Sequence, residues 1–459
     1  MNRKRIYLCL AHMSDDGMEQ KYVKEAFDTN WVVPLGPNVD AFEKDLETFV
    51  SDVRGLKADV GGGALNKRVV ALSSGTAAVH LGLLAAGVKP GDEVIVQSFT
   101  FCASTHPVTY LGATPVLVDS EPDTWNIDPL LLEEAIKDRI AKTGKAPAAI
   151  VPVALYGMPY KADRIMEIAD RYGIPVVEDA AEGFGSRYKG QVLGTFGRYG
   201  VLSFNGNKII TTSGGGALIT ANDDEWREIM MYATQYRESY PYYQHEKIGY
   251  NYRMSNICAG IGRGQMTVVN DHLAHHKHVQ ALYEELLKDV PGVTVHKQPD
   301  ARCQMADGGE MPVYDSNYWL CTITIDEGVK VKGQENAYKA IVTGAVGGAA
   351  GVIHAAASAH TDCEPNANVE AMRVALDQAQ IEARPLWKPM HKQPVYCRGE
   401  MEEVRRKNYS VVTSASSVAY VNGVSEALFK VGMCLPAGPY VTDDDVRYIV
   451  DTIRASIVG

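Results

Sequence analysis

Positive charge is not in excess in this sequence. The 459 residues include 45 Lys and Arg against 56 Asp and Glu, which gives a formal net charge of −11 at pH 7. This balance excludes a general affinity for nucleic acid or anionic membrane surfaces. Any phosphate group that the protein binds must therefore be held by local contacts, and we expect neither nucleic acid nor a membrane as a partner.

Long apolar runs are also missing. The most apolar long stretch, residues 340–357, contains several glycines and His354, which makes it a poor membrane span. Near the N-terminus, the apolar run Ile6–Ala11 is shorter than the ~7–15 residues of a secretory signal. We therefore expect a cytoplasmic protein.

Patterns typical of disulfides, metal sites and dinucleotide sites are absent. The eight cysteines are scattered without a CxxC pair, so we expect reduced thiols. Glycine triplets at 61–63 and 214–216 lack the GxGxxG spacing, and no NAD site is predicted. Four histidines share one predicted helix but lie on different faces, without a carboxylate or cysteine that completes a site. We expect a solvated helix surface and no bound metal at these four: His272, His275, His276 and His278.

A regular alternation of strand-like and helix-like segments runs from residue 69 to residue 220. Short β-branched runs, such as VVAL at 69–72 and IPVVED at 174–179, alternate with amphipathic patterns. One helix is expected to begin at Asp128-Pro129, an N-cap followed by proline at the first helical position. The alternation is typical of an α/β fold with a parallel sheet covered by helices.

The length exceeds that of a single ordinary core, so a large domain and a smaller one are expected. A long helix predicted at 271–290 would join them, with the boundary near residue 275. An Ala/Gly-rich segment at 341–362 has no clear period and is interpreted as an insertion in the smaller domain.

Lys208 lies between polar and glycine-rich turns in the segment SFNGNKIITTSGGGALIT, residues 203–220. Alone, it could be an ordinary surface lysine. Upstream, Gly75 and Thr76 open a predicted helix directly after a strand, where backbone N–H groups bind phosphate well. A simple Ser N-cap is the other interpretation of that motif.

Asp179 ends a predicted buried strand, at the edge where ligands of open α/β sheets collect. A buried carboxylate needs a cationic partner, and a protonated pyridine nitrogen is one. Capping a helix is the alternative role. In SFTFCAST at 98–105, Phe99 and Phe101 could each stack on a flat ring or fill the core.

The order of these motifs resembles the DegT/StrS family of pyridoxal-phosphate (PLP)-dependent sugar aminotransferases, over nearly the whole chain. Within it the sequence is most similar to the enzymes that make UDP-4-amino-4,6-dideoxy-N-acetylglucosamine, a precursor of bacillosamine; this narrower likeness includes IEARPLWKPMH at 381–391 and CLPAG at 434–438. The family motifs are GPNVDAFE at 36–43, SSGTAAVHL, GDEVIVQSFTF, EDAAEGFGSRYKG at 178–190, the Asn-Lys pair ending at Lys208, and GYNYRMSN at 249–256.

The resemblance implies PLP-dependent aminotransferase fold type I. Its large PLP-binding domain, residues 1–275 with an N-terminal arm, would contain a mostly parallel seven-stranded sheet flanked by helices. A smaller α+β C-terminal domain, residues 276–459, would contain the Ala/Gly-rich insertion. The family also implies a homodimer with shared active sites.

The resemblance also implies residue roles. Lys208 would be the Schiff-base lysine, Asp179 the partner of the pyridinium nitrogen, and Phe101 the ring-stacking aromatic. Many relatives carry Gln at Glu182, so its contact with the cofactor's phenolic oxygen requires one of the two oxygens to hold a proton. Phosphate contacts are expected from Gly75, Thr76, Ser203 and, across the dimer, Asn251. Substrate contacts are expected from Asn30, Trp31, Val32, Val33, Asn251, Arg384, Pro385, Leu386, Trp387 and Lys388.

The implied activity is transfer of an amino group from glutamate to C-4 of a UDP-4-keto-6-deoxy-N-acetylhexosamine in bacterial surface glycan biosynthesis. One alternative is the same fold acting on a different keto sugar or an aminocyclitol precursor. Another is a catalytically silent binding or regulatory homologue. The presence of both Lys208 and Asp179 speaks against the silent homologue.

Overall fold

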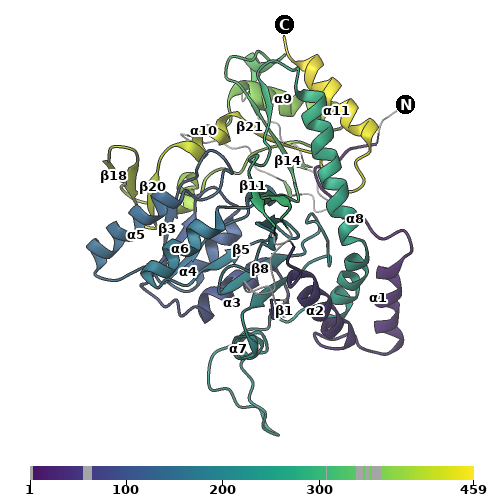
Figure 1. Cartoon of the computed structure of the whole chain (residues 1–459), viewed down its shortest axis with the longest axis vertical. Helices are drawn as coiled ribbons and strands as arrows, with labels where there is room; N and C mark the ends of the chain where they lie inside the picture. Colours follow the sequence, from purple (N-terminus) through teal and green to yellow (C-terminus); the bar gives the residue numbers. More distant parts are fainter. Residues whose placement is uncertain are drawn as a thin grey trace.

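A computed structural model describes residues 4–54, 65–305, 308–337, 345–346, 352–353 and 363–458. The predicted insertion at 341–362 lies outside these residues except for two short pieces. In the view of Figure 1, the large sheet and its helices form the lower part of the molecule, and the C-terminal elements α9, β14, β21 and α11 lie above them. The long helix α8 (Asn256–Leu287) runs along both.

Seven strands form the sheet of the large domain, in the order β3, β2, β4, β5, β8, β9, β1. Parallel bridges between Ile150 and Val176 and between Val153 and Asp179 join β4 to β5. All neighbours are parallel except at β9, which is antiparallel to both β1 and β8. The predicted mostly parallel sheet is confirmed. Its strands are β1 (Arg68–Leu72), β2 (Glu93–Gln97), β3 (Thr114–Val118), β4 (Ala149–Val151), β5 (Val177–Asp179), β8 (Tyr199–Ser203) and β9 (Gly216–Thr220).

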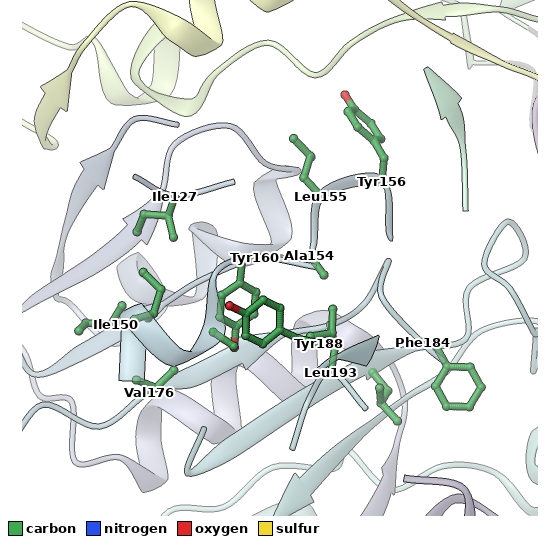
Figure 2. Packing of buried hydrophobic residues seen from close by; sticks show 14 of the residues in the cluster. Ile127, Ile150, Ala154, Leu155, Tyr156, Tyr160, Val176, Phe184, Tyr188 and Leu193 are labelled. Atoms are coloured by element: carbon green, nitrogen blue, oxygen red, sulfur yellow. The ribbon is translucent and has the colours of Figure 1, made fainter. Parts of the chain in front are cut away.

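Alternate residues of these strands belong to two different cores, as the two-residue period of a strand requires. Ile95 of β2 packs in the core with α5 and α6, whereas its neighbours Val94 and Val96 pack in the core with α3. Figure 2 shows part of the first core, in which Ile150 and Val176 lie near the Tyr160 and Tyr188 rings. Helices therefore cover both faces of the sheet. The helices of this domain are α1 (Met18–Asp28), α2 (Pro37–Val50), α3 (Gly75–Ala85), α4 (His106–Tyr110), α5 (Pro129–Thr143), α6 (Ala162–Tyr172) and α7 (Asp223–Ala233).

The predicted start of α5 is present in the structure. The Asp128 carboxylate accepts hydrogen bonds from the N–H groups of Leu130 and Leu131, with Pro129 at the first helical position. The long helix predicted at 271–290 is also present, but α8 begins at Asn256, where the Ser255 hydroxyl caps it. The helix crosses the domain boundary expected near residue 275, and that boundary stays a prediction.

A second, antiparallel sheet of order β10, β14, β21, β17 forms the C-terminal domain. It buries its own core against α9, α11 and the second half of α8. The elements are β10 (Val293–Val295), β14 (Cys321–Ile325), α9 (Ala367–Gln378), β17 (Arg384–Pro385), α10 (Val424–Val431), β21 (Gly432–Leu435) and α11 (Asp443–Ser456).

One feature of the sheet was not predicted from the sequence. The strand β20 (Val418–Val421) pairs in parallel with β3, and β19 (Ser410–Thr413) and β18 (Glu402–Arg405) extend the large sheet beyond it. The new edge strand β18 is exposed along its whole length and carries charged side chains, which disfavour pairing with another chain. Shorter elements are β6 (Arg187–Tyr188), β7 (Gln191–Val192), β11 (Arg302–Gln304), β12 (Glu310–Pro312), β13 (Tyr314–Asp315), β15 (Ala345–Val346), β16 (Val352–Ile353), η1 (Cys102–Ser104), η2 (Leu155–Gly157), η3 (Gln334–Asn336), η4 (Met390–Lys392) and η5 (Pro394–Tyr396).

The interpretation of the four α8 histidines as a solvated surface is wrong for two of them. His272 and His276 are buried, and their Nδ1 atoms lie 3.0 and 3.1 Å from the carbonyl oxygens of Ile209 and Tyr318. Burial lowers the pKa of both imidazoles, to about 3 for His276. They pack α8 against two loops. Within the described residues, no group of three or more His, Cys, Asp and Glu side chains is arranged to hold a metal ion.

No helix in the described part of the chain combines the length and apolar character needed to cross a membrane.

Candidate active site

A cavity of about 300 Å³ lies at the carboxyl edge of the large sheet. Its walls come from the start of α3, the ends of β5 and β8, and the turn that follows β8. Open α/β sheets bind ligands at this edge, because the loops after parallel strands meet there. The cavity contains most of the cofactor residues that the sequence predicts: Gly75, Thr76, Phe101, Asp179, Glu182, Ser203 and Lys208.

The start of α3 and the end of β8 form one end of the cavity. Ser74 caps the helix by accepting a hydrogen bond from the Ala77 N–H at 3.0 Å, and Gly75 is the first helical residue. The first N–H groups of a helix have no partner inside the helix and attract anions. A Cβ atom on Gly75 would lie 3.0 Å from Cβ of Ser203, so glycine lets the two segments approach closely. This end fits a phosphate group.

Asp179 ends β5 and is 96% buried, with 4% of its surface exposed. Its carboxylate accepts hydrogen bonds from the Ser104 hydroxyl at 2.6 Å and from the Ala181 N–H at 3.1 Å. Burial raises the pKa of Asp179, while these two donors and the Lys208 charge act to lower it. The carboxylate therefore has fixed geometry and a strong preference for a cationic partner.

Lys208 lies in the turn after β8, where its N–H donates to the Asn205 carbonyl at 3.0 Å. Its Nζ atom is 3.5 Å from a Glu182 carboxylate oxygen and 3.8 Å from the centre of the Trp319 ring. These two contacts hold the amine in place. The lysine is thus held inside the cavity, and the alternative of a surface lysine is excluded.

Glu182 is buried and has two distinct contacts. One carboxylate oxygen accepts a hydrogen bond from the Tyr156 N–H at 2.8 Å, and the other faces Lys208. Burial raises the pKa of Glu182, opposed by the Lys208 charge and the Tyr156 N–H. A carboxyl group with a raised pKa can hold a proton.

Aromatic side chains form the remaining wall. Phe101 is 53% exposed, and its ring centre lies 5.8 Å from that of Trp387. The Trp387 N–H donates to the Tyr156 hydroxyl at 2.7 Å, which fixes the backbone of the segment that follows β17. Phe99 is fully buried in the core, so of the two phenylalanines only Phe101 lines the cavity.

Two further cavities adjoin the first on either side of Trp387. One, of about 500 Å³, is lined by the N-terminal arm, Glu382 and Arg384. The other, of about 400 Å³, is lined by Phe101, His106 and Lys388 among others. Both share Trp387 with the central cavity. A substrate larger than the central cavity can therefore extend into either of these two adjoining cavities.

Other predicted substrate residues lie elsewhere. Pro385 pairs with β21, and the Leu386 side chain packs in the core. The loop Asn30–Val33 is exposed and is held to α8 by Asn256, which contacts the Trp31 and Val33 carbonyl oxygens. Asn251 is exposed beside the Thr234 backbone and does not line the cavity of its own chain.

Several residues at the site were not assigned a role from the sequence, among them Ser104 and Trp319. Ser104 belongs to the quoted SFTFCAST motif, and a hydroxyl near a buried carboxylate could have been considered. Trp319 lies two residues before β14, and its indole N–H donates to the Asn207 carbonyl at 2.6 Å. The sequence gives no signal for that long-range contact.

PLP fits this set of groups. Its phosphate matches the N–H groups at the start of α3, its ring nitrogen matches the buried Asp179 carboxylate, and its aldehyde needs a primary amine such as Lys208. The class that this fold and site define is the PLP-dependent aminotransferases of fold type I.

Comparison with known proteins gives the family. The model of the DegT/DnrJ/EryC1/StrS aminotransferase family matches residues 13–343, and the chain belongs to this family. It is similar to the pyridoxal phosphate-dependent aminotransferase EpsN of Bacillus subtilis, with 39% identity over 98% of this chain and 95% of the relative. GDP-perosamine synthase of Caulobacter vibrioides is 32% identical over 96% of each chain. The protein is thus a PLP-dependent sugar aminotransferase.

A solved structure of a DegT/DnrJ/EryC1/StrS aminotransferase from Brucella abortus has the same fold. Its TM-score is 0.72, with 24% identity over 96% of this chain and 95% of that one.

Proposed function

We propose that the protein transfers an amino group from glutamate to C-4 of a UDP-4-keto-6-deoxy-N-acetylhexosamine, in the biosynthesis of a bacterial surface glycan. The observation that carries this proposal is the position of Lys208. It lines the same cavity as Asp179, and two further cavities adjoin that cavity. The narrower choice of sugar is supported by the likeness of the segments 203–216, 249–262, 381–391 and 434–438 to the bacillosamine-pathway enzymes.

The residues of the chain have separate tasks in this reaction. When bound, PLP supplies an electron-accepting ring, which stabilises charge at the substrate carbon. Asp179 holds a proton at the ring nitrogen. Lys208 would hold the cofactor through its amine and would move a proton to or from the substrate carbon. Gly75, Thr76 and Ser203 hold the phosphate, and a protonated Glu182 donates to the phenolic oxygen.

The two side cavities provide space for the rest of a nucleotide sugar. Arg384 in one cavity forms an ion pair with Glu382 at 2.7 Å, so the charge of that pair is balanced. The other cavity is lined by Lys388 and His106, among other residues. Each cavity therefore has a basic side chain in its wall, which suits the diphosphate of a nucleotide sugar.

The nearest rival is the same chemistry on another acceptor. GDP-perosamine synthase, with 32% identity to this chain, supports a GDP-linked keto sugar as the alternative acceptor. The nucleotide base distinguishes the two hypotheses, whereas the cofactor site does not.

A panel of acceptors tests the proposed substrate. Purified protein, PLP and glutamate are incubated with UDP-, GDP- and dTDP-linked 4-keto sugars and with 3-keto sugars, and the products are identified by NMR. We expect the UDP-4-keto-N-acetylhexosamine to be aminated at C-4 with the highest kcat/KM. Preferred amination of a GDP sugar, or of a 3-keto carbon, would replace the proposal with the rival.

We further propose a homodimer in which each active site takes Asn251 from the partner. Support comes from the exposure of Asn251 and of three tyrosines in the same segment, Tyr240, Tyr242 and Tyr243. This segment follows α7 and projects from the body of the chain (Figure 1). Loss of one hydrogen bond to a charged phosphate should weaken cofactor binding by ~1.5–3 kcal/mol.

Subunit mixing tests the shared site. We expect inactive Lys208→Ala and impaired Asn251→Ala proteins to regain activity when mixed, because one site of each mixed dimer then has both residues intact. The matched control mixes Lys208→Ala with Asp179→Asn. These two residues line the same cavity of one chain, so no site is complete and activity stays lost. Absence of recovery after verified subunit exchange, or full activity as a monomer, would exclude the shared site.

A further inference from the structure

A Ser–His–Glu series lies at the base of the loop that carries Phe101 and takes no part in the reaction described above. The Ser98 hydroxyl oxygen is 2.6 Å from Nδ1 of His391, and Nε2 of His391 is 3.1 Å from a Glu426 carboxylate oxygen. Ser98 is 1% exposed and His391 is 7% exposed. Ser98 therefore cannot reach a substrate as a nucleophile.

The hydrogen bonds define the proton positions. The His391 backbone N–H donates to the Ser98 hydroxyl oxygen at 3.3 Å, so the single hydroxyl hydrogen is available for Nδ1. Nδ1 is then the acceptor, and Nε2 carries the hydrogen that it donates to Glu426.

The series connects three parts of the chain that meet at the active site. Ser98 directly follows β2 and lies three residues before Phe101. His391 lies four residues after Trp387, and the Met390 N–H also donates to the Ser98 carbonyl at 2.8 Å. Glu426 is in the first turn of α10, where it also contacts Lys392 at 3.3 Å. The helix α10 leads directly into β21, the partner of β17.

We infer that His391 is a positioning residue. It fixes the segment that carries Trp387 and Lys388 against the loop that carries Phe101. Residues of both segments line the 400 Å³ cavity, which shares Phe101 and Trp387 with the cofactor site. A wall that is already ordered before binding does not lose conformational entropy when the nucleotide sugar arrives, and the affinity for that substrate is correspondingly higher. The side-chain bond from His391 to Ser98 carries the effect, in addition to the Met390 N–H bond to the Ser98 carbonyl, which a change of the His391 side chain leaves in place.

Two substitutions of similar shape test the contacts of the two imidazole nitrogens one at a time. In His391→Asn the side-chain amide takes the place of Nδ1 and keeps the contact with Ser98 while losing Glu426. In His391→Gln the amide takes the place of Nε2 and keeps Glu426 while losing Ser98. Ser98→Ala removes the same bond from the other side. The control is His278→Gln, an exposed histidine of α8 that contacts Asp443 far along the chain.

Two measurements are made on the PLP-loaded protein. Hydrogen exchange is followed in peptides covering 98–105 and 384–396, and kcat and KM are determined separately for glutamate and for the nucleotide sugar. We expect faster exchange in both peptides for His391→Gln and Ser98→Ala, with KM for the sugar raised about 3- to 10-fold and KM for glutamate unchanged. His391→Asn and the control should resemble the wild type. The double variant Ser98→Ala/His391→Gln should be no worse than either single variant.

The exchange measurement does not depend on the sugar assigned under the proposed function, on which only the KM comparison rests. Failure of every sugar to react would overturn the proposed function and leave the exchange result to decide the positioning role. Unchanged exchange in His391→Gln and Ser98→Ala would overturn the inference. It would equally be overturned if exchange rose across the whole chain, or if His391→Asn were as impaired as His391→Gln, because a general loss of stability would then explain the data.

Discussion

Replacement of Lys208 by alanine should remove the visible absorbance of the bound cofactor and nearly all transamination. The reason is that Lys208 is the only lysine among the described residues that line the cofactor cavity. The general acid–base role alone is worth about 10²–10⁴-fold in rate, and loss of the covalent bond to the cofactor adds to it. Absorbance spectra and turnover with glutamate as donor measure the two effects separately.

Two further variants test whether the positive charge of Lys208 or its reactive amine is required. Lys208→Arg keeps a positive charge beside Glu182 and Trp319, but a guanidinium does not give up its proton in a protein, so we expect it to be equally inactive. Lys142→Ala removes an exposed lysine that pairs with Asp138 and should behave as wild type. A cofactor band that survives in Lys208→Ala would place the covalent bond at another lysine.

Much of the sheet could be predicted because its strands have a local signature. Runs such as VVAL and EVIV are short, β-branched and followed by helical patterns, and they became β1 and β2. The strand β8, Tyr199–Ser203, was missed because the sequence YGVLS contains a glycine and comes only a few residues before the polar turn of Lys208. The direction of β9 was not predictable either, since a residue pattern does not say which neighbour a strand pairs with.

At the site, too, local features could be predicted and contacts between distant parts of the chain could not. Asp179 and Gly75 could be placed because the end of a buried strand and the start of a helix are local features with a direct chemical meaning. Trp319 could not, because it contacts Lys208 from more than 100 residues further along the chain. The link from Ser98 to His391 joins residues 293 positions apart, and only the folded chain brings them together.

Replacement of Asp179 by asparagine should preserve the fold and the bound cofactor but lower turnover about 10²–10³-fold, a typical effect of removing one electrostatic partner from an active site. The asparagine oxygen can still accept from the Ala181 N–H. Its amide group can face Ser104, whose hydroxyl is 2.8 Å from the Thr100 hydroxyl and can donate there instead. What disappears is the negative charge that holds a proton at the ring nitrogen.

The control for this substitution lies one residue earlier on the same strand. Glu178 is also fully buried and its pKa is also raised by burial, but it accepts hydrogen bonds from the Tyr160 hydroxyl at 2.7 Å and from the Phe196 N–H at 3.0 Å and does not line the cavity. We therefore expect Glu178→Gln to remain active while Asp179→Asn does not. The rate of the absorbance change after mixing with glutamate reports the chemical step in both variants. Near-normal rates in Asp179→Asn would remove this carboxylate from the mechanism, and equal losses in both variants would reassign the effect to disturbance of β5.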